Sequence, residues 1–257
     1  MSASMESILG GYDDPRAGKY WDSVDGSLVT DHPAFPYKGI RNGALLGAKG
    51  LRQPYSNISS NFKTATERKV LDAAEVHLML AEGVLRGWDI TGTAEAHYKM
   101  GVKESFAYWG AGGADAYLAN STGLPTNYDD PKETGVVNDF TTRITNTVAW
   151  DEAASNEIKL EKIITQKWIA SFTNSVESWV DHRRTGYPKL PYNYKNDSST
   201  SPFGTVANDD FLRRHPFPQK ESDNNPTGVA DATAKLSNGK NEIGTRLWWD
   251  TGVESNF

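Results

Sequence analysis

Cysteine is absent from this sequence of 257 residues. Its absence excludes disulfide bonds, zinc sites built from thiolates and a thiol nucleophile. The HExxH zinc signature, the GxSxG hydrolase signature and the P-loop of nucleotide-binding enzymes are also missing. The five histidines show no metal-ligand spacing, and we interpret His77, on an apolar helix face, as a hydrogen-bonded core histidine. We therefore expect neither a metal ion nor a cofactor.

The sequence is also short of basic residues and of long apolar runs, which limits the partners expected for the protein. Basic residues number 27 against 33 acidic ones, and the net charge of −6 provides no positive field that would collect phosphate groups. Nucleic acid is therefore not expected as a partner. No run of about eighteen apolar residues occurs, and the first residues lack the basic start and apolar middle of a signal peptide. We expect no membrane-spanning helix.

Aromatic residues are plentiful by contrast, with eight tryptophans and eleven tyrosines. Large rings fill the gaps between helices, because aromatic side chains contribute mainly by burial. Rings on exposed loops can instead stack on a ligand. Composition alone leaves both interpretations open.

The clearest regular pattern lies in residues 67–109, where a helix is predicted from about Thr66. Its first apolar stripe consists of Leu71, Ala74, Leu78, Ala81 and Leu85. A second apolar row beside it consists of Ala73, His77, Leu80, Val84 and Trp88, so this helix expects neighbours on two sides. Gly87 is placed to end the helix and Thr93 to begin the next. Two helices joined by a short loop are antiparallel, and small residues on their facing sides are typical of a tetratricopeptide (TPR) repeat.

Two more helices are predicted at residues 156–172 and 176–184, the latter ended by Gly186. The other segments lack helical periodicity and are predicted as loops: residues 1–60, 111–155 and 187–257. The expected fold is therefore mainly α, a single domain over residues 1–257. It contains a TPR-like antiparallel helix pair at 67–109, further helices, and long irregular loops that carry aromatic residues.

Charged residues gather within two turns of the fourth predicted helix, namely Glu177, Asp181, Arg183 and Arg184. A structural salt-bridge network is the favoured interpretation, and a ligand-binding arginine is the alternative. Acidic residues are numerous enough to include the carboxylate pair of a glycoside hydrolase, but no spacing identifies such a pair.

Blocks along the chain resemble, in order, the SusD/RagB family of nutrient-binding outer-membrane lipoproteins. Residues 74–88 (AEVHLMLAEGVLRGW) resemble the signature helix of that family. Its other blocks are similar to residues 14–16 (DPR), 37–39 (YKG), 98–105 (YKMGVKES), 164–172 (ITQKWIASF), 177–188, 213–218 (RRHPFP) and 246–250 (RLWWD). Family members begin with a lipidated cysteine and further TPR helices, which this chain lacks. The resemblance is therefore to the C-terminal half of the family.

The resemblance implies a protein that binds a glycan, or a peptide, at the bacterial surface without catalysis. It implies delivery of the ligand to a TonB-dependent transporter of the SusC type in the outer membrane. Contact with the membrane would come only through a lipid anchor that is absent from this chain. On loop placement alone, the candidate glycan-stacking residues are Trp21, Tyr37, Tyr55, Tyr117 and Tyr192.

Two other functions remain open. A TPR-type protein-interaction scaffold would bind a transporter or peptide through its helices and show no sugar affinity. A glycoside hydrolase would release reducing ends from a polysaccharide. Because a function inferred from a fold family is an analogy, the three are distinguished only by binding and activity measurements.

Overall fold

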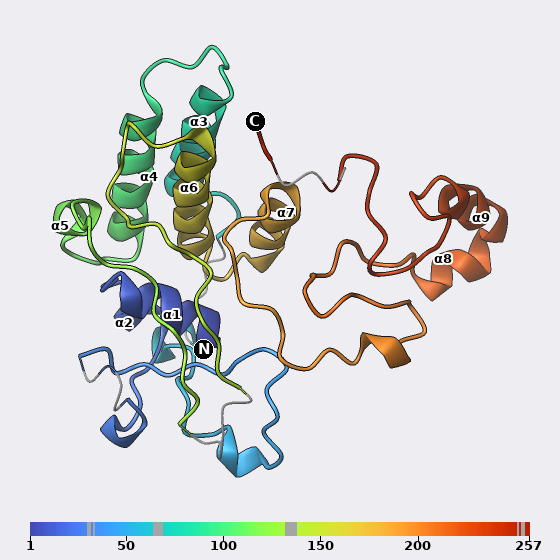
Figure 1. Cartoon of the computed structure of the whole chain (residues 1–257), viewed down its shortest axis with the longest axis horizontal. Coiled ribbons are helices and arrows are strands. Elements are labelled where there is room, and N and C mark those ends of the chain that lie inside the picture. Colours follow the sequence, from blue (N-terminus) through green and yellow to red (C-terminus); the bar gives the residue numbers. More distant parts are fainter. Residues whose placement is uncertain (30–31, 33, 64–68, 132–137, 251, 253–254) are drawn as a thin grey trace. The chain divides into compact units, whose positions relative to one another are not determined.

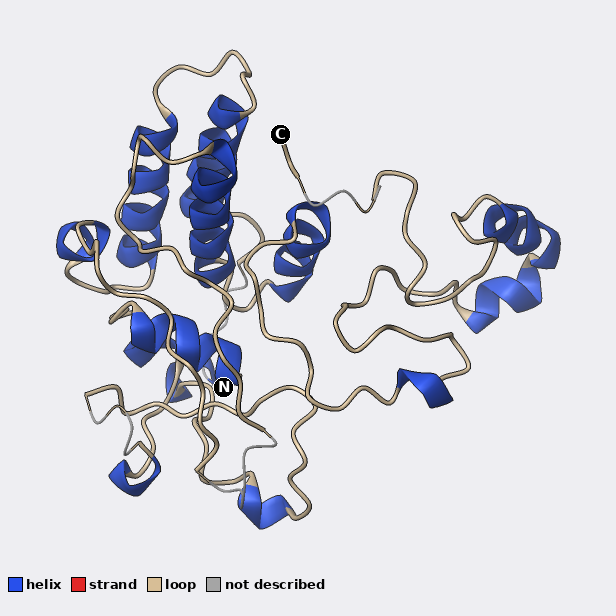
Figure 2. Ribbon diagram, viewed as in Figure 1, coloured by secondary structure: helices blue, strands red, loops and turns tan. Residues whose placement is uncertain are grey.

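The computed structural model describes the chain except for residues 30–31, 33, 64–68, 132–137, 251 and 253–254. Within the described residues the regular elements are all helices, and β pairing is limited to isolated bridges such as Trp21 with Ile58 (Figure 2). The prediction of a mainly α fold is confirmed. The start predicted near Thr66 falls outside the described residues.

The described chain divides into two compact units, which we treat separately. The first comprises residues 1–41, 45–191 and 257, and the second comprises 42–44 and 192–256. The helices of the first unit are α1 (Ala3–Gly11), α2 (Ala17–Tyr20), α3 (Ala73–Leu85), α4 (Ala94–Tyr108), α5 (Ala114–Leu118), α6 (Asn156–Ala170) and α7 (Ser175–Thr185). Those of the second are α8 (Gln219–Asn224) and α9 (Pro226–Ala234), and short 3₁₀ turns occur at Gly26–Leu28, Lys49–Leu51, Ser60–Lys63 and Ser198–Thr200.

Helices α3 and α4 form the predicted antiparallel pair. The Thr93 hydroxyl accepts a hydrogen bond from the backbone N–H of Ala96 at 3.1 Å, which confirms this residue as the N-cap of α4. The Asp72 carboxylate caps α3 through the N–H of Glu75 at 2.7 Å, so α3 begins later than its apolar pattern suggested. Helix α6 lies beside both and packs on α3, giving α3 neighbours on two sides (Figure 1).

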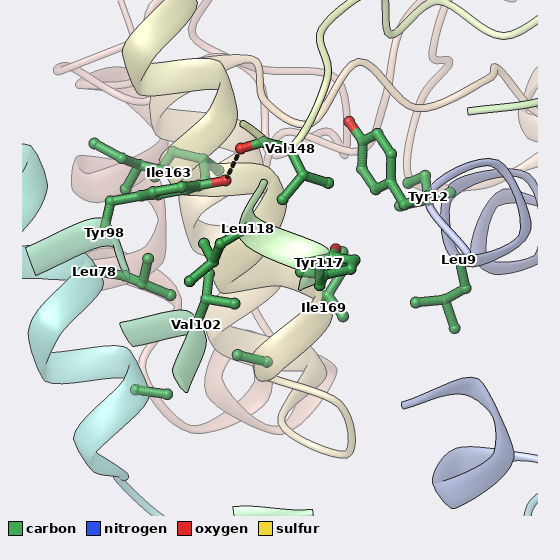
Figure 3. Close-up of a cluster of buried hydrophobic side chains, with 14 of the residues drawn as sticks. Leu9, Tyr12, Leu78, Tyr98, Val102, Tyr117, Leu118, Val148, Ile163 and Ile169 are labelled. Carbon is green, nitrogen blue, oxygen red and sulfur yellow. Dashed lines mark hydrogen bonds between the residues drawn. The ribbon is translucent and has the colours of Figure 1, made fainter. Parts of the chain in front are cut away.

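The hairpin is closely packed because a glycine lies at its crossing point. A Cβ added to Gly101 on α4 would meet Leu78 Cγ at 2.7 Å and the Ala74 carbonyl oxygen at 3.0 Å. Around this contact Leu78, Tyr98 and Ile163 form part of a core in which the Tyr98 hydroxyl donates to the Val148 carbonyl at 2.7 Å (Figure 3). A buried tyrosine thereby fixes the long loop before α6 against the hairpin.

Several helices fall in segments that the sequence predicted as loops. The prediction is wrong for α1, where Ala3, Met5, Glu6, Ser7, Ile8, Leu9 and Gly10 are all buried. A helix buried on most sides has no polar face and therefore no helical periodicity. Helices α5, α8 and α9 also lie in predicted loops, because they are too short to show a helical period. The start of α9 is stabilised by Pro226 in its first turn and by the Asn225 side chain, which accepts a hydrogen bond from the N–H of Gly228. Gly186 ends α7 with φ of 75°, as predicted.

Arg16 is buried at the start of α2 and ties four segments together. Its guanidinium pairs with Asp14 (Nη2 to Oδ2 2.6 Å), and both side chains have no exposed surface. It also donates to Ser105 of α4 at 2.9 Å, to Gln166 of α6 at 2.9 Å and to the Tyr117 hydroxyl of α5 at 3.3 Å. Burial alone would lower the pKa of Arg16, but the Asp14 carboxylate raises it overall, so the arginine stays charged.

A second charged network joins α3, α6 and α7. Lys167 of α6 pairs with Asp181 of α7 at 2.8 Å and with Glu75 of α3 at 3.5 Å. Arg184 bridges from Asp181 at 2.9 Å to Glu82 of α3 at 2.8 Å. The salt-bridge interpretation is therefore confirmed for Asp181 and Arg184.

The other two charged residues of α7 behave differently. Arg183 lies over the ring of Trp179, with 3.8 Å between guanidinium carbon and ring centroid, which is a cation–π contact. Glu177 is half-buried and takes no part in the ion pairs of Lys167 and Arg184.

We expect Gly101→Ala to destabilise the protein by about 1–3 kcal/mol, because overpacking a tight contact costs more than alanine gains in helix propensity. Urea unfolding measures the change. Gly112→Ala is the control, since a Cβ there meets nothing within 4 Å. Equal stability of the two variants would show that the α3–α4 crossing tolerates a methyl group.

We expect Glu82→Gln to lower stability by about 1–3 kcal/mol at pH 7, because Arg184 loses one of its two carboxylate partners and Arg86 loses its own. Burial would raise the pKa of Glu82, but Arg184 and Arg86 hold it below its usual value. Because its pKa is lower in the folded state, the ionised Glu82 carboxylate stabilises the fold fully above about pH 4.3, the usual pKa of glutamate in an unfolded chain. This stabilisation is lost as the pH falls through the pKa of Glu82 in the folded protein.

Urea titrations at several pH values measure the free energy of unfolding of wild type and Glu82→Gln. The difference between the two free energies should become smaller as the pH falls from about 5 to the lowest pH at which the protein still folds. Glu104→Gln on α4, outside the network, is the matched control. A difference that stays constant over this pH range would contradict the assigned role of Glu82.

Candidate functional site

A small pocket lies beside α1 in the first unit. It has a volume of about 210 Å³ and is lined by Glu6, Gly10, Val29, His32, Phe35, Tyr37, Thr126 and Asn127. Pockets for drug-sized ligands usually measure about 300–1,000 Å³. This one therefore suits a single small ring or a substituent of a larger ligand.

One wall of the pocket is the segment around residue 126, which runs against α1. The Thr126 N–H donates to the Ser7 carbonyl at 3.0 Å, and the Ser7 hydroxyl donates back to the Thr126 carbonyl. At the end of the helix, a Cβ on Gly11 would lie 2.1 Å from the Leu124 carbonyl oxygen. Only a glycine permits this approach, so the close packing of this segment on the end of α1 depends on the glycine at position 11.

The opposite wall is the loop that carries Tyr37, fixed to α1 by a buried carboxylate. Glu6 accepts from the Gly39 N–H at 2.6 Å and pairs with Lys38 Nζ at 2.8 Å. The Tyr128 hydroxyl donates to the Gly39 carbonyl at 2.7 Å. The Glu6 charge is thus compensated within the protein, and a neutral ligand fits the pocket better than a cation.

Three of the eight lining residues carry rings, and of these His32 and Tyr37 are half-buried while Phe35 is buried beneath them. His32 lies stacked on Phe35 with ring centroids 5.8 Å apart, and Phe35 meets Tyr37 edge to face at 5.1 Å. Burial raises the pKa of Tyr37, which keeps its hydroxyl protonated. Asn127 is exposed at the rim, where its side-chain oxygen accepts from the Thr142 N–H. Flat apolar faces with a few polar groups suit a sugar, which presents C–H faces and hydroxyls.

Of the five predicted stacking residues, Tyr37 is the one that lines this pocket. Trp21 is half-buried and packs edge to face on Phe172 at 5.0 Å, and its indole N–H has no hydrogen-bond partner among the described residues. Tyr192 lies in the second unit, where its ring contacts Phe211 at 5.2 Å. The binding roles of these residues stay predictions.

The other two predicted residues have structural partners. Tyr55 is 3% exposed, and its hydroxyl donates to Asp130. Tyr117 is 5% exposed and belongs to the Arg16 cluster, where Gln166 donates to its hydroxyl at 2.8 Å. Burial raises the pKa of both. Neither ring offers a face to a ligand in this arrangement, because side chains already cover it.

Among the lining residues, His32, Phe35, Thr126 and Asn127 are not predicted from the sequence. The loop after residue 28 did carry a signal, because three aromatic or imidazole rings occur within six residues, from 32 to 37. Nothing in the local sequence connects that loop with residue 126, because both pack on α1, a segment that the sequence predicts as a loop.

No three histidine, aspartate or glutamate side chains converge on a possible metal position within the described part of the chain. In the same part of the chain, no helix has the length and apolar character that a membrane crossing requires.

Comparison with known proteins identifies relatives. The family described as SusD-like, the SusD and RagB outer membrane lipoproteins, matches residues 1–250. A chitin-binding SusD homologue from Flavobacterium johnsoniae is 42% identical, with a TM-score of 0.87 over 98% of this chain and 50% of that chain. No curated protein is significantly similar to the chain.

Two further solved structures are comparable. A SusD homologue from Bacteroides vulgatus is 37% identical with a TM-score of 0.86, over 99% of this chain and 50% of that one. A SusD-like protein from Bacteroides thetaiotaomicron is 34% identical with a TM-score of 0.84, over 96% and 50%. The chain therefore spans about half the length of the relatives it matches.

Proposed function

The chain belongs to the SusD-like family of outer-membrane lipoproteins, and we propose that it binds a glycan at the bacterial surface without catalysing a reaction. The ligand would pass to a TonB-dependent transporter of the SusC type in the outer membrane. The observation that carries this proposal is the 42% identity, over 98% of the chain, to a homologue described as chitin-binding.

The pocket beside α1 supports glycan binding on physical grounds. The half-buried rings of His32 and Tyr37, which pack on the buried Phe35, can face the C–H surface of a sugar ring. The pocket volume of about 210 Å³ suits one ring. Thr126 and Asn127 supply polar groups at its other side. The pocket is held by α1 and the loops around it, so a ligand finds its contacts already in place.

A TPR-type interaction scaffold remains the second candidate because of one observation. On α3, Val76 is 37% and Met79 41% exposed, and both are large apolar side chains. An exposed apolar helix face suits a protein partner better than a sugar. This function predicts capture of a protein or peptide and no affinity for polysaccharides.

We expect Tyr37→Ala to weaken glycan binding by about tenfold or more, because a central aromatic contact typically contributes 1–2 kcal/mol or more. Isothermal titration calorimetry with chitin oligosaccharides, and affinity electrophoresis against a polysaccharide panel, measure the change. Tyr108→Ala is the matched control, since this tyrosine is 52% exposed at the end of α4 and far along the chain from the pocket loops.

Four outcomes separate the candidates. Binding that is lost in Tyr37→Ala and kept in Tyr108→Ala supports the pocket. Binding that both variants keep moves the ligand site elsewhere and leaves the family function intact. Absence of binding by the folded wild-type protein across the panel counts against glycan recognition, and release of reducing ends would show catalysis.

A further inference from the structure

Two histidines face each other across the α3–α4 hairpin, away from the pocket. His77 lies on the outward apolar row of α3, and His97 lies in the first turn of α4. Their Nδ1 atoms are 3.2 Å apart, and the ring centroids are 5.5 Å apart with 29° between the ring planes. Both side chains are half-buried and so reachable from solvent. His77 is thus hydrogen-bonded, as its sequence position suggested, but its partner is another titratable ring.

The proton positions in this pair follow from its neighbours. His97 Nε2 lies 2.9 Å from the Thr91 carbonyl oxygen, which can only accept a hydrogen bond. Nε2 of His97 therefore carries the proton, and in the neutral ring its Nδ1 presents a lone pair. His77 Nδ1 must then donate to it. Metal-binding histidines in proteins commonly show the same arrangement, with one nitrogen donating to a carbonyl and the other holding the metal.

The spacing also agrees with shared coordination. Two imidazole nitrogens about 2.05 Å from one ion and 3.2 Å from each other subtend about 100° at that ion. This angle lies near the tetrahedral value. We propose that His77 and His97 form a two-imidazole site for a divalent transition-metal ion, with water filling the remaining positions.

Binding requires a small rearrangement but no net loss of a proton. The His77 ring turns about its Cβ–Cγ bond, a torsion with a broad range in histidine. The proton on His77 Nδ1 is exchanged through water for one on Nε2, so the ring stays neutral and its Nδ1 lone pair faces the ion. His97 keeps its proton on Nε2 and its hydrogen bond to Thr91.

The helices around the pair provide rigidity. Thr93 caps α4 one turn before His97. One turn after His97, Gly101 packs closely on Leu78, the residue that follows His77. Because the two ligands come from different helices, a bound ion links α3 to α4. Binding to the folded state alone then stabilises the protein in proportion to the logarithm of metal concentration. Imidazole ligands favour Zn²⁺, Ni²⁺ and Cu²⁺, with Cu²⁺ bound most tightly.

The test uses the purified protein without a histidine tag, titrated with NiCl₂ and CuCl₂. We expect one Ni²⁺ per chain by calorimetry and a rise in thermal midpoint with Ni²⁺ concentration. His77→Gln and His97→Gln should each weaken binding by at least about tenfold, since loss of an outer-shell partner alone costs about 10–100-fold. His215→Gln is the control, because His215 is an exposed histidine of the second unit.

Electron paramagnetic resonance of bound Cu²⁺ gives a readout that misfolding cannot imitate. We expect nitrogen superhyperfine structure from two imidazoles in wild type and His215→Gln, and from one in each hairpin variant that stays folded by circular dichroism. Equal affinity in wild type and both hairpin variants, or a single-imidazole spectrum in wild type, would overturn the proposal. Since the site does not involve the glycan pocket, these outcomes are independent of glycan binding.

Discussion

The arrangement of the first unit depends on one buried guanidinium. Arg16 has no exposed surface, and removing such a charge from water costs several kcal/mol unless every donor finds an acceptor. Asp14 supplies the countercharge, and Ser105, Tyr117 and Gln166 supply the remaining acceptors from α4, α5 and α6. These partners lie on separate helices, so the charge is compensated only when the helices are assembled around it. The main effect of the cluster is therefore to select one arrangement of the helices, and its net contribution to stability is smaller.

This constraint connects the helices with the candidate ligand pocket. Arg16 directly follows the turn after α1, and α1 contributes Glu6 and Gly10 to the lining of the pocket. Helix α1 in turn holds the Tyr37 loop through Glu6 and the opposite wall through Ser7. The side chains proposed to face a ligand thus lie on loops, while the buried charged residues Glu6 and Arg16 help to position those loops. With this arrangement, residues on the loops can be substituted to suit another ligand without altering the helical scaffold.

Much of the fold could be predicted where sequence periodicity reflects a single buried face. Helix α3 with its apolar stripe, the Thr93 cap and the Gly186 terminus followed from local rules. Helix α1 did not, because Ile8 and Leu9 are buried together with Glu6 and Ser7 and leave no polar side. The pocket was only partly predictable for the same reason. Tyr37 was chosen because it lies on a loop, whereas Thr126 lines the pocket through its hydrogen bonds to Ser7 of α1, a helix that the sequence did not reveal. Tyr117 shows the opposite case, in which a loop-like segment forms a helix and buries its ring beside Arg16.

The most direct test of the role of Arg16 is amide hydrogen exchange of the Arg16→Lys variant compared with wild type. Lysine keeps the charge but cannot reach Asp14, Ser105 and Gln166 together, because it is a single point charge without the planar fork of arginine. We expect faster exchange in α2, α4, α5 and α6 alike, or loss of the folded state. Faster exchange confined to residues 14–20, with α4 to α6 protected as in wild type, would contradict the view that this guanidinium holds the helices together.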